Sequence, residues 1–129
     1  MYGVAADLNL SEFTGATLTQ IAIGEYQLQF HFHRSSNGKT CHAEISVEGK
    51  WQLRDSLGSM LDSCERTSLP YSQKSCHSLQ VLLGQSVAAT SVDPPTSFSL
   101  RFSSGYTLQI YDDSTEFESF SIQPGDVFV

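Results

Sequence analysis

Strict alternation of apolar and polar residues in two pairs of neighbouring segments is the feature that most limits the folds open to this chain. Gln, His, Glu, Ser, Arg or Thr separates the apolar positions, so an extended segment has one apolar and one polar face. This period of two is typical of half-buried β-strands. The apolar positions are Tyr26, Leu28, Phe30 and Phe32, then Cys41, Ala43, Ile45 and Val47, then Phe98, Leu100 and Phe102, and finally Tyr106, Leu108 and Ile110.

Turn-forming residues separate the two members of each pair. The segment Ser35–Lys39 contains Asn37-Gly38, and the segment Ser103–Gly105 ends in glycine. Asparagine and glycine tolerate the positive φ angles that tight hairpin turns require. The sequence therefore predicts two antiparallel hairpins.

The two halves of the chain carry similar patterns, which predicts an internal repeat. The motif FTGxxL around Gly15 matches LLGxxV around Gly84 at an offset of 69 residues (84 − 15). At an offset of 72, the motif YxLxF that begins at Tyr26 falls on FxLxF beginning at Phe98, with the extra residues placed in the loop Asp93–Pro95. Each copy is expected to contain a helical turn followed by three strands.

Short helical turns are expected before the strands of each copy. Leu79, Leu82 and Leu83 have the i, i+3, i+4 spacing of a helix face, and Leu10 with Phe13 is the counterpart in the first copy. These positions predict one short helix or two.

The segment between the copies is rich in serine and poor in apolar anchors, which predicts a linker or mobile loop. Within it, Leu57, Met60 and Leu61 are placed to form one helical turn. We therefore expect a single domain over residues 1–129, with repeat one at about 8–55, the serine-rich linker at about 56–77 and repeat two at about 78–129. The expected fold is mainly β, with an α+β arrangement as the alternative: two diverged antiparallel β-meander repeats packed as a sandwich or half-barrel.

The charge balance limits the partners of this domain. Fourteen Asp and Glu oppose seven Lys and Arg, which gives a formal net charge of −7. Such a surface repels phosphate and anionic lipid, so we expect no nucleic-acid or membrane partner and favour a basic protein partner. No apolar run approaches the length of a bilayer span, and the first residues lack the pattern of a secretory signal, so a cytoplasmic location is expected. The expected oligomeric state is a monomer or a weak homodimer.

Cysteine spacing argues against a disulfide framework or a zinc ribbon. Cys41, Cys64 and Cys76 are odd in number and form no C-x-x-C motif. A Cys64–Cys76 bridge stays open as an alternative.

Four polar residues of the first hairpin are weak candidates for a metal site. His31 and His33 share one strand face, and His42 and Glu44 are expected to face the same way on the partner strand. Three imidazoles and a carboxylate suit Zn²⁺ or Fe²⁺. The competing interpretation, which we favour, is a solvated sheet face, because these are the polar positions of an amphipathic hairpin.

The chain shows no arrangement of residues typical of an enzyme. It contains neither G-x-S-x-G nor a glycine-rich phosphate loop, and the adjacent side chains of Cys76 and His77 should diverge. Asp112 and Asp113 follow an expected strand, where turn chemistry explains them. We therefore expect no catalytic residues and no cofactor.

Acidic residues gather near the end of the chain, where no Lys or Arg follows Arg101. Aromatic residues are interleaved with them, which is typical of an anchor surrounded by steering charges at a protein interface. The alternative is a solvated edge whose charges discourage aggregation. The candidate protein-binding residues are Asp112, Asp113, Glu116, Phe117 and Glu118.

Four passages of the chain resemble a group of short, mostly uncharacterised bacterial proteins. They are LTQIAIGEYQLQF, ISVEGKWQLRD, LLGQSV and DDSTEFESFSIQPG, the last containing the D-D-S-x-x-[FY]-E-S-F pattern of the group. In size and charge such proteins are similar to immunity proteins, which block a toxin by binding it. The resemblance implies a non-enzymatic inhibitor that neutralises a cationic toxin. The alternative is a metal-binding or small-molecule-binding β domain, with or without enzymatic activity.

Overall fold

The computed structural model describes residues 3–65, 76–112, 119–123 and 127–128. Over these ranges it contains ten β-strands and one 3-10 helix, η2 (His77–Leu82). The strands are β1 (Thr17–Ile23), β2 (Leu28–Ser36), β3 (Lys39–Val47), β4 (Trp51–Arg54), β5 (Met60–Cys64), β6 (Val87–Asp93), β7 (Ser97–Phe102), β8 (Thr107–Tyr111), β9 (Phe120–Gln123) and β10 (Val127–Phe128).

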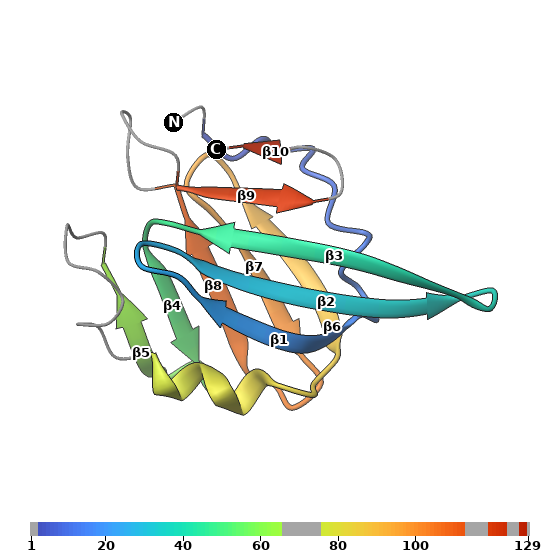
Figure 1. Ribbon diagram of the computed structural model, residues 1–129. Coiled ribbons are helices and arrows are strands. Elements are labelled where there is room, and N and C mark those ends of the chain that lie inside the picture. The colour runs from blue at the N-terminus through green and yellow to red at the C-terminus, as the bar shows by residue number, and fades with distance from the viewer. Residues whose placement is uncertain (1–2, 66–75, 113–118, 124–126, 129) are drawn as a thin grey trace.

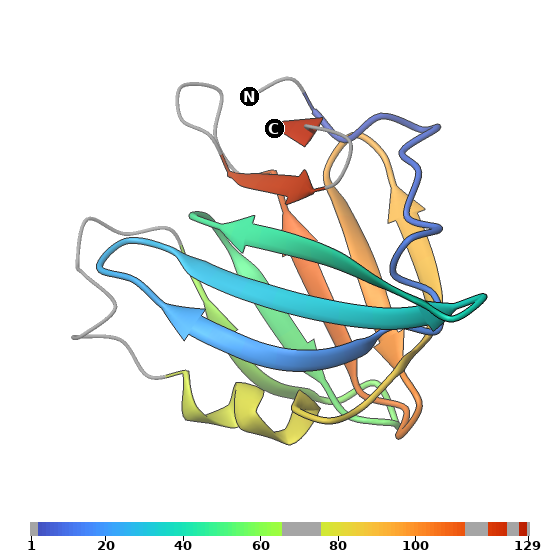
Figure 2. The ribbon, with the colours of Figure 1, turned by 45° about the vertical axis from the view of Figure 1, so that its right-hand side comes forward.

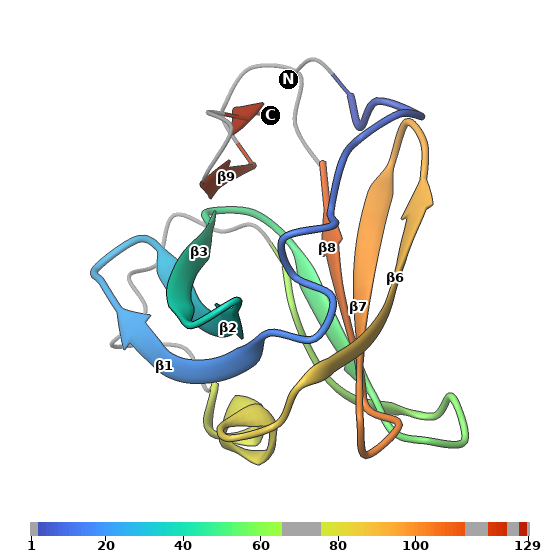
Figure 3. The ribbon, with the colours of Figure 1, turned by 90° about the vertical axis from the view of Figure 1, so that its right-hand side faces the viewer.

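The strands form two five-stranded antiparallel sheets that pack face to face. The first sheet has the order β1-β2-β3-β9-β10, and the second has the order β5-β4-β8-β7-β6. The strands of the first sheet run across those of the second (Figure 1), and η2, drawn in yellow, lies across one open side of the sandwich (Figure 3). The expected mainly β sandwich is confirmed, and the described strands do not close into a barrel.

Each half of the chain builds a three-stranded meander in one sheet and then crosses to the other. Figure 2 shows β3 of the first sheet passing directly into β4 of the second. There β4 pairs with β8, with Trp51 opposite Ile110, while β9 returns to pair with β3, with Phe120 opposite Val47. Trp51 and Phe120 are again 69 residues apart (120 − 51). The fourth strand of each half thus joins the sheet of the other half, and the fifth strand pairs beside it at the edge.

Matched backbone hydrogen bonds join the two halves where their first strands begin. The Gly15 N–H donates to the carbonyl of Val87, and its counterpart 69 residues later, the Gly84 N–H, donates to the carbonyl of Leu18, both at 2.8 Å. A second matched pair follows: the Leu18 N–H donates to the carbonyl of Gln85, and the Val87 N–H donates to the carbonyl of Ala16, both at 2.9 Å. Gly15 and Gly84 have φ angles of 84° and 83°, a region that side chains with a Cβ disfavour. These positive φ angles explain why glycine occurs at both matched positions.

The strand register corrects one part of the expected repeat. A β-bulge interrupts the first hairpin of each half, just after Leu18 and just after Val87. Leu18 is opposite Phe32 and Val87 is opposite Phe102, so the second strands correspond at an offset of 70 (102 − 32), and the expected 72 is wrong. Because side chains alternate with a period of two, a slip of two residues leaves the same face apolar. Alternation alone therefore could not distinguish the two offsets.

Tyr26 was expected on the buried face of the first strand, and this is wrong. It lies in the turn before β2 begins at Leu28, and 54% of the residue is exposed. The turn is closed by a hydrogen bond from the Gly24 N–H to the carbonyl of Gln27 at 2.8 Å. The second strand therefore begins at Leu28, one alternation later than the sequence pattern indicates.

The helical turn expected at Leu57, Met60 and Leu61 is also wrong. The carboxylate of Asp55 accepts hydrogen bonds from the N–H groups of Leu57 and Ser59, both at 2.9 Å, which fixes a tight turn. The chain then enters β5, which pairs with β4. The first part of the expected serine-rich linker is thus an edge strand, and residues 66–75 lie outside the described ranges.

The core consists largely of the alternating apolar residues that the sequence singled out. Leu10, Phe13, Leu79 and Leu82, from the expected helical turns, are buried beside them, whereas Leu83 is exposed. Among the described residues, no helix has the length and hydropathy that crossing a bilayer requires. Cys41 and Tyr106, which alternation also assigned to the apolar face, are only half-buried. The positions predicted from alternation that are buried are Leu28, Phe30, Phe32, Ala43, Ile45, Val47, Phe98, Leu100, Phe102, Leu108 and Ile110.

Trp51 is the largest fully buried side chain among the described residues. Its indole N–H has no hydrogen-bond partner within the part of the chain that the structure describes. Phe120 occupies the equivalent position in the second half, where it packs edge-on against Phe98 with ring centroids 4.9 Å apart. The site of Trp51 therefore uses the bulk of the indole ring rather than its polar atom.

We expect Trp51→Phe to destabilise the domain much less than Trp51→Ala. Phenylalanine keeps most of the buried ring and abandons no hydrogen bond, whereas alanine leaves a large cavity and should cost about 3–5 kcal/mol of unfolding free energy. Chemical denaturation followed by circular dichroism measures both values. Equal losses for the two variants would contradict a role based on ring volume.

Candidate functional site

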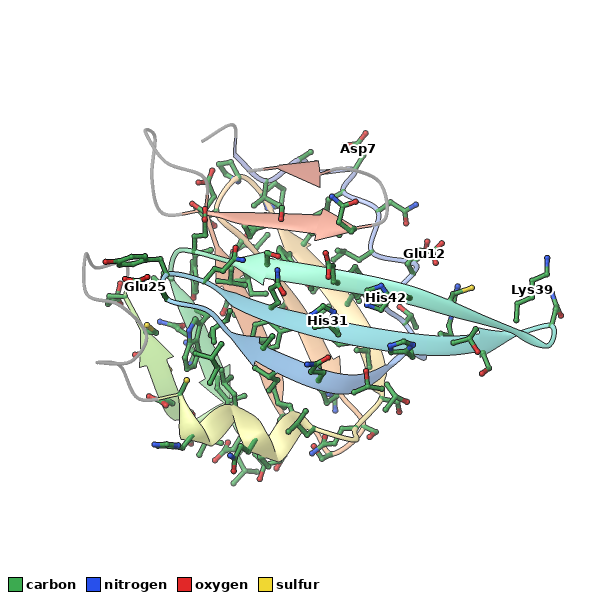
Figure 4. All side chains as sticks on the ribbon, in the orientation of Figure 1. Asp7, Glu12, Glu25, His31, Lys39 and His42 are labelled. Carbon is green, nitrogen blue, oxygen red and sulfur yellow. The ribbon has the colours of Figure 1, made fainter. Side chains whose placement is uncertain are left out.

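The candidate metal ligands come together on the outer face of the first sheet. In the β2–β3 hairpin His31 is opposite Glu44 and His33 is opposite His42, so the register places all four side chains on one face. Asn37 and Gly38 close this hairpin with φ angles of 52° and 78°, as the turn sequence predicts. Figure 4 shows His31 and His42 next to each other on the outer face of β2 and β3.

Three of these four residues bring potential ligand atoms close together. The Nδ1 atom of His31 lies 3.1 Å from Nε2 of His42 and 3.2 Å from a carboxylate oxygen of Glu44. The ligand atoms of the three residues all lie within 4.8 Å of one another. We call His31, His42 and Glu44 the His–Glu cluster.

His33 lies beside the His–Glu cluster but outside it. Its ring centroid is 5.0 Å from that of His42 at a tilt of 56°, while the His31 and His42 rings stack at 5.3 Å. The three imidazoles therefore form a continuous row across the two strands. Two of them, with Glu44, present the convergent ligand atoms.

The second candidate region is the connection that returns the chain from β8 to β9. The equivalent connection in the first half, between β3 and β4, needs only residues 48–50 to cross between the sheets. The β8–β9 connection spans residues 112–119, which is eight residues against three. Crossing the sandwich therefore does not require the additional length, and we call residues 112–119 the acidic insert.

Asp112, at the start of the acidic insert, is bound within the domain. Its carboxylate accepts hydrogen bonds from the Gly3 N–H at 2.9 Å and the Ser119 hydroxyl at 3.1 Å. Partial burial favours a higher pKa for this carboxyl group, but hydrogen bonds and local positive charge outweigh it and lower the pKa. Asp112 thus ties the two ends of the acidic insert and the N-terminal segment together.

The other predicted protein-binding residues lie outside the described ranges. They are Asp113, Glu116, Phe117 and Glu118. The structure fixes only the two ends of the acidic insert, at Asp112 and Ser119, and the role of these four residues stays a prediction.

Two exposed apolar residues that the sequence pattern did not reveal, Ile23 and Tyr26, lie at the β1–β2 turn, at the end of the first sheet where β9 starts. Leu28, Val47 and Phe120 lie side by side there, so the β1–β2 turn is next to the start of β9. That turn exposes Tyr26 and follows Ile23, which is 59% exposed. Alternation assigned Tyr26 to the core, and the turn residues Gly24 and Glu25 just before it were the signal that it lies outside the strand.

Several basic side chains are engaged by neighbouring groups of the same chain. Arg34 pairs with Glu12 at 3.4 Å, and Lys50 pairs with Glu65 at 3.6 Å while it lies over the ring of Tyr111. These contacts neutralise part of the positive charge locally. The net charge of the whole chain is still −7, so the field around the domain is negative.

No disulfide joins Cys41, Cys64 and Cys76, so the Cys64–Cys76 bridge left open by the sequence is not formed. Burial, and secondarily the charge of Asp62, raises the pKa of the Cys76 thiol. This thiol is therefore protonated near neutral pH, which makes it a poor nucleophile.

A comparison with known protein families, curated protein sequences and solved structures finds no match to this chain. The resemblance to short bacterial proteins therefore stays a prediction.

We expect Asp112→Ala to lower the free energy of unfolding by about 1–2 kcal/mol, because two donors lose their acceptor. A carboxyl group whose pKa is lower in the folded state stabilises the fold at pH values above its unfolded pKa, about 3.9. That contribution disappears as the pH falls below 3.9 through the folded pKa. Denaturation curves at several pH values should therefore show a shallower loss of stability below pH 4 for Asp112→Asn than for the native chain. Parallel curves would contradict this role, and Asp7→Asn, at an exposed position, is the control.

Proposed function

We propose that this domain is a non-enzymatic, immunity-type inhibitor that binds and neutralises a cationic toxin in the cytoplasm, as a monomer or weak homodimer. Binding at a toxin's basic surface requires only a complementary charged surface and no catalytic group. Toxins that act on nucleic acid need positive charge to hold phosphates, so an acidic inhibitor can compete for that surface.

The observation that carries the proposal is the length of the acidic insert compared with its counterpart in the first half. Three residues suffice to connect β3 with β4, whereas eight connect β8 with β9. The eight include Asp112, Asp113, Glu116 and Glu118. Since the fold does not need this length, binding is the best explanation for the extra acidic residues.

The exposed residues Ile23 and Tyr26 lie at the same end of the domain as the acidic insert, which supports this end as the binding surface. Aromatic residues surrounded by charges are enriched at protein interfaces, where the ring supplies buried area and the charges supply orientation. Glu25 lies between these two exposed residues in the sequence. We therefore assign Tyr26 as an apolar anchor and the acidic insert as the source of electrostatic attraction.

The proposal is tested with the product of the gene next to the one that encodes this domain. We expect that product to arrest growth when it is expressed alone, and co-expression of this domain to relieve the arrest. Purified proteins should form a complex by size-exclusion chromatography. If the two proteins neither bind nor show protection, the proposed function is wrong.

Charge reversal then tests the binding surface. Glu116→Lys with Glu118→Lys should slow association with the toxin by at least about tenfold at low salt, because steering depends on local charge. Thr40→Lys, Ser56→Lys, Ser59→Lys and Ser103→Lys together change the net charge equally, at exposed positions in or beside the β2–β3, β4–β5 and β7–β8 turns, and form the matched control. Stopped-flow measurements at several salt concentrations compare the two variants. An equal loss in both variants would show that net charge alone matters and would contradict the assignment to the acidic insert.

A further inference from the structure

We propose that the His–Glu cluster is a binding site for a divalent transition-metal ion such as Zn²⁺. The site is independent of the proposed inhibitor function and uses none of the residues assigned to toxin binding. Its two imidazoles and one carboxylate form a donor set that such ions accept. Three protein ligands leave one position of a tetrahedral ion open for water or a further ligand.

Two of the three distances between ligand atoms of the His–Glu cluster are close to those around a small tetrahedral ion. With metal–ligand distances of about 2.0–2.1 Å, neighbouring ligand atoms of a tetrahedral site are about 3.3 Å apart. His31 Nδ1 lies 3.1 Å from His42 Nε2 and 3.2 Å from the Glu44 carboxylate. Two edges of the tetrahedron are thus already close to their required length, and a small adjustment of Glu44 and His42 forms the third.

Hydrogen bonding explains the geometry of the His–Glu cluster less completely than a metal ion does. An imidazole nitrogen either donates one proton or accepts one hydrogen bond through its lone pair, so His31 Nδ1 cannot make a full hydrogen bond with both His42 and Glu44. A single cation at the centre would instead accept an electron pair from all three residues at once. The ligand atoms of all three residues lie within 4.8 Å of one another, which is the convergence that a shared cation requires.

The sheet holds the backbone of the three ligands in place. β2 and β3 are interior strands of the first sheet, flanked by β1 and β9, and His31 and Glu44 are directly opposite each other. His42 and Glu44 are two residues apart on one strand and share its outer face. Most of the site is therefore preorganised, and only side-chain rotations are needed to bind the ion.

The proposal is tested by titrating the full chain with ZnCl₂ in a buffer that does not bind metal, near pH 7.5, with calorimetry as the readout. We expect one ion per chain, with affinity reduced at least about tenfold by His31→Ala, His42→Ala or Glu44→Gln, since even indirect partners of metal ligands matter by 10–100-fold. His77→Ala removes an exposed histidine from η2 and should leave affinity unchanged.

Two further measurements keep a negative result interpretable. Circular dichroism of the metal-free variants should match that of the native chain, so that lost affinity does not reflect unfolding. In NMR spectra, Zn²⁺ should shift the ring signals of His31 and His42 but not those of His77. The proposal is wrong if the native chain binds no Zn²⁺ at about 0.1 mM, or if a folded His31→Ala/His42→Ala double variant binds it as tightly as the native chain does. Neither result would affect the test of toxin binding.

Discussion

The exchange of fourth strands between the two halves is the constraint on which the rest of this structure depends. A three-stranded meander with one apolar face cannot stay folded in water until that face is covered. Here each meander is covered by the other, and each is also extended by a strand that the other supplies. The buried rings of Trp51 and Phe120 lie on these exchanged strands, so pairing within the sheets and packing between them are formed by the same residues.

Much of this architecture could be predicted from residues that alternate or that form turns. Alternation identified the buried faces of β2, β3, β7 and β8, and Asn37-Gly38 identified the hairpin that aligns His31 with Glu44. The repeated glycines indicated the internal repeat, and the structure places them where the two halves are hydrogen-bonded to each other. These features are local, because a period of two or a positive φ angle is determined by a few neighbouring residues.

The features that the sequence did not reveal depend on contacts between distant segments. Alternation in β4 shows that Trp51 is buried, but not that its strand joins β8 instead of continuing the first sheet. The two-residue error in the repeat has the same origin, because only cross-strand pairing fixes the register. In the candidate sites, the pattern placed His31, His42 and Glu44 on one face, whereas their convergence on one point depends on side-chain rotamers. The internal contacts of Asp112 with Gly3 and Ser119 had no signature in the sequence at all.

The strand exchange also has a consequence for a shorter chain. A polypeptide made of one half alone would carry a meander with one unfilled neighbouring position and a fourth strand with no sheet of its own. Two copies of that polypeptide would satisfy both needs at once by trading fourth strands around a two-fold axis, with the matched hydrogen bonds of Gly15 and Gly84 at that axis. The present domain therefore has, within one continuous chain, the strand exchange that such a dimer would have between two chains. Because its two halves need not be identical, one half carries the longer acidic crossing and the other carries the row of histidines.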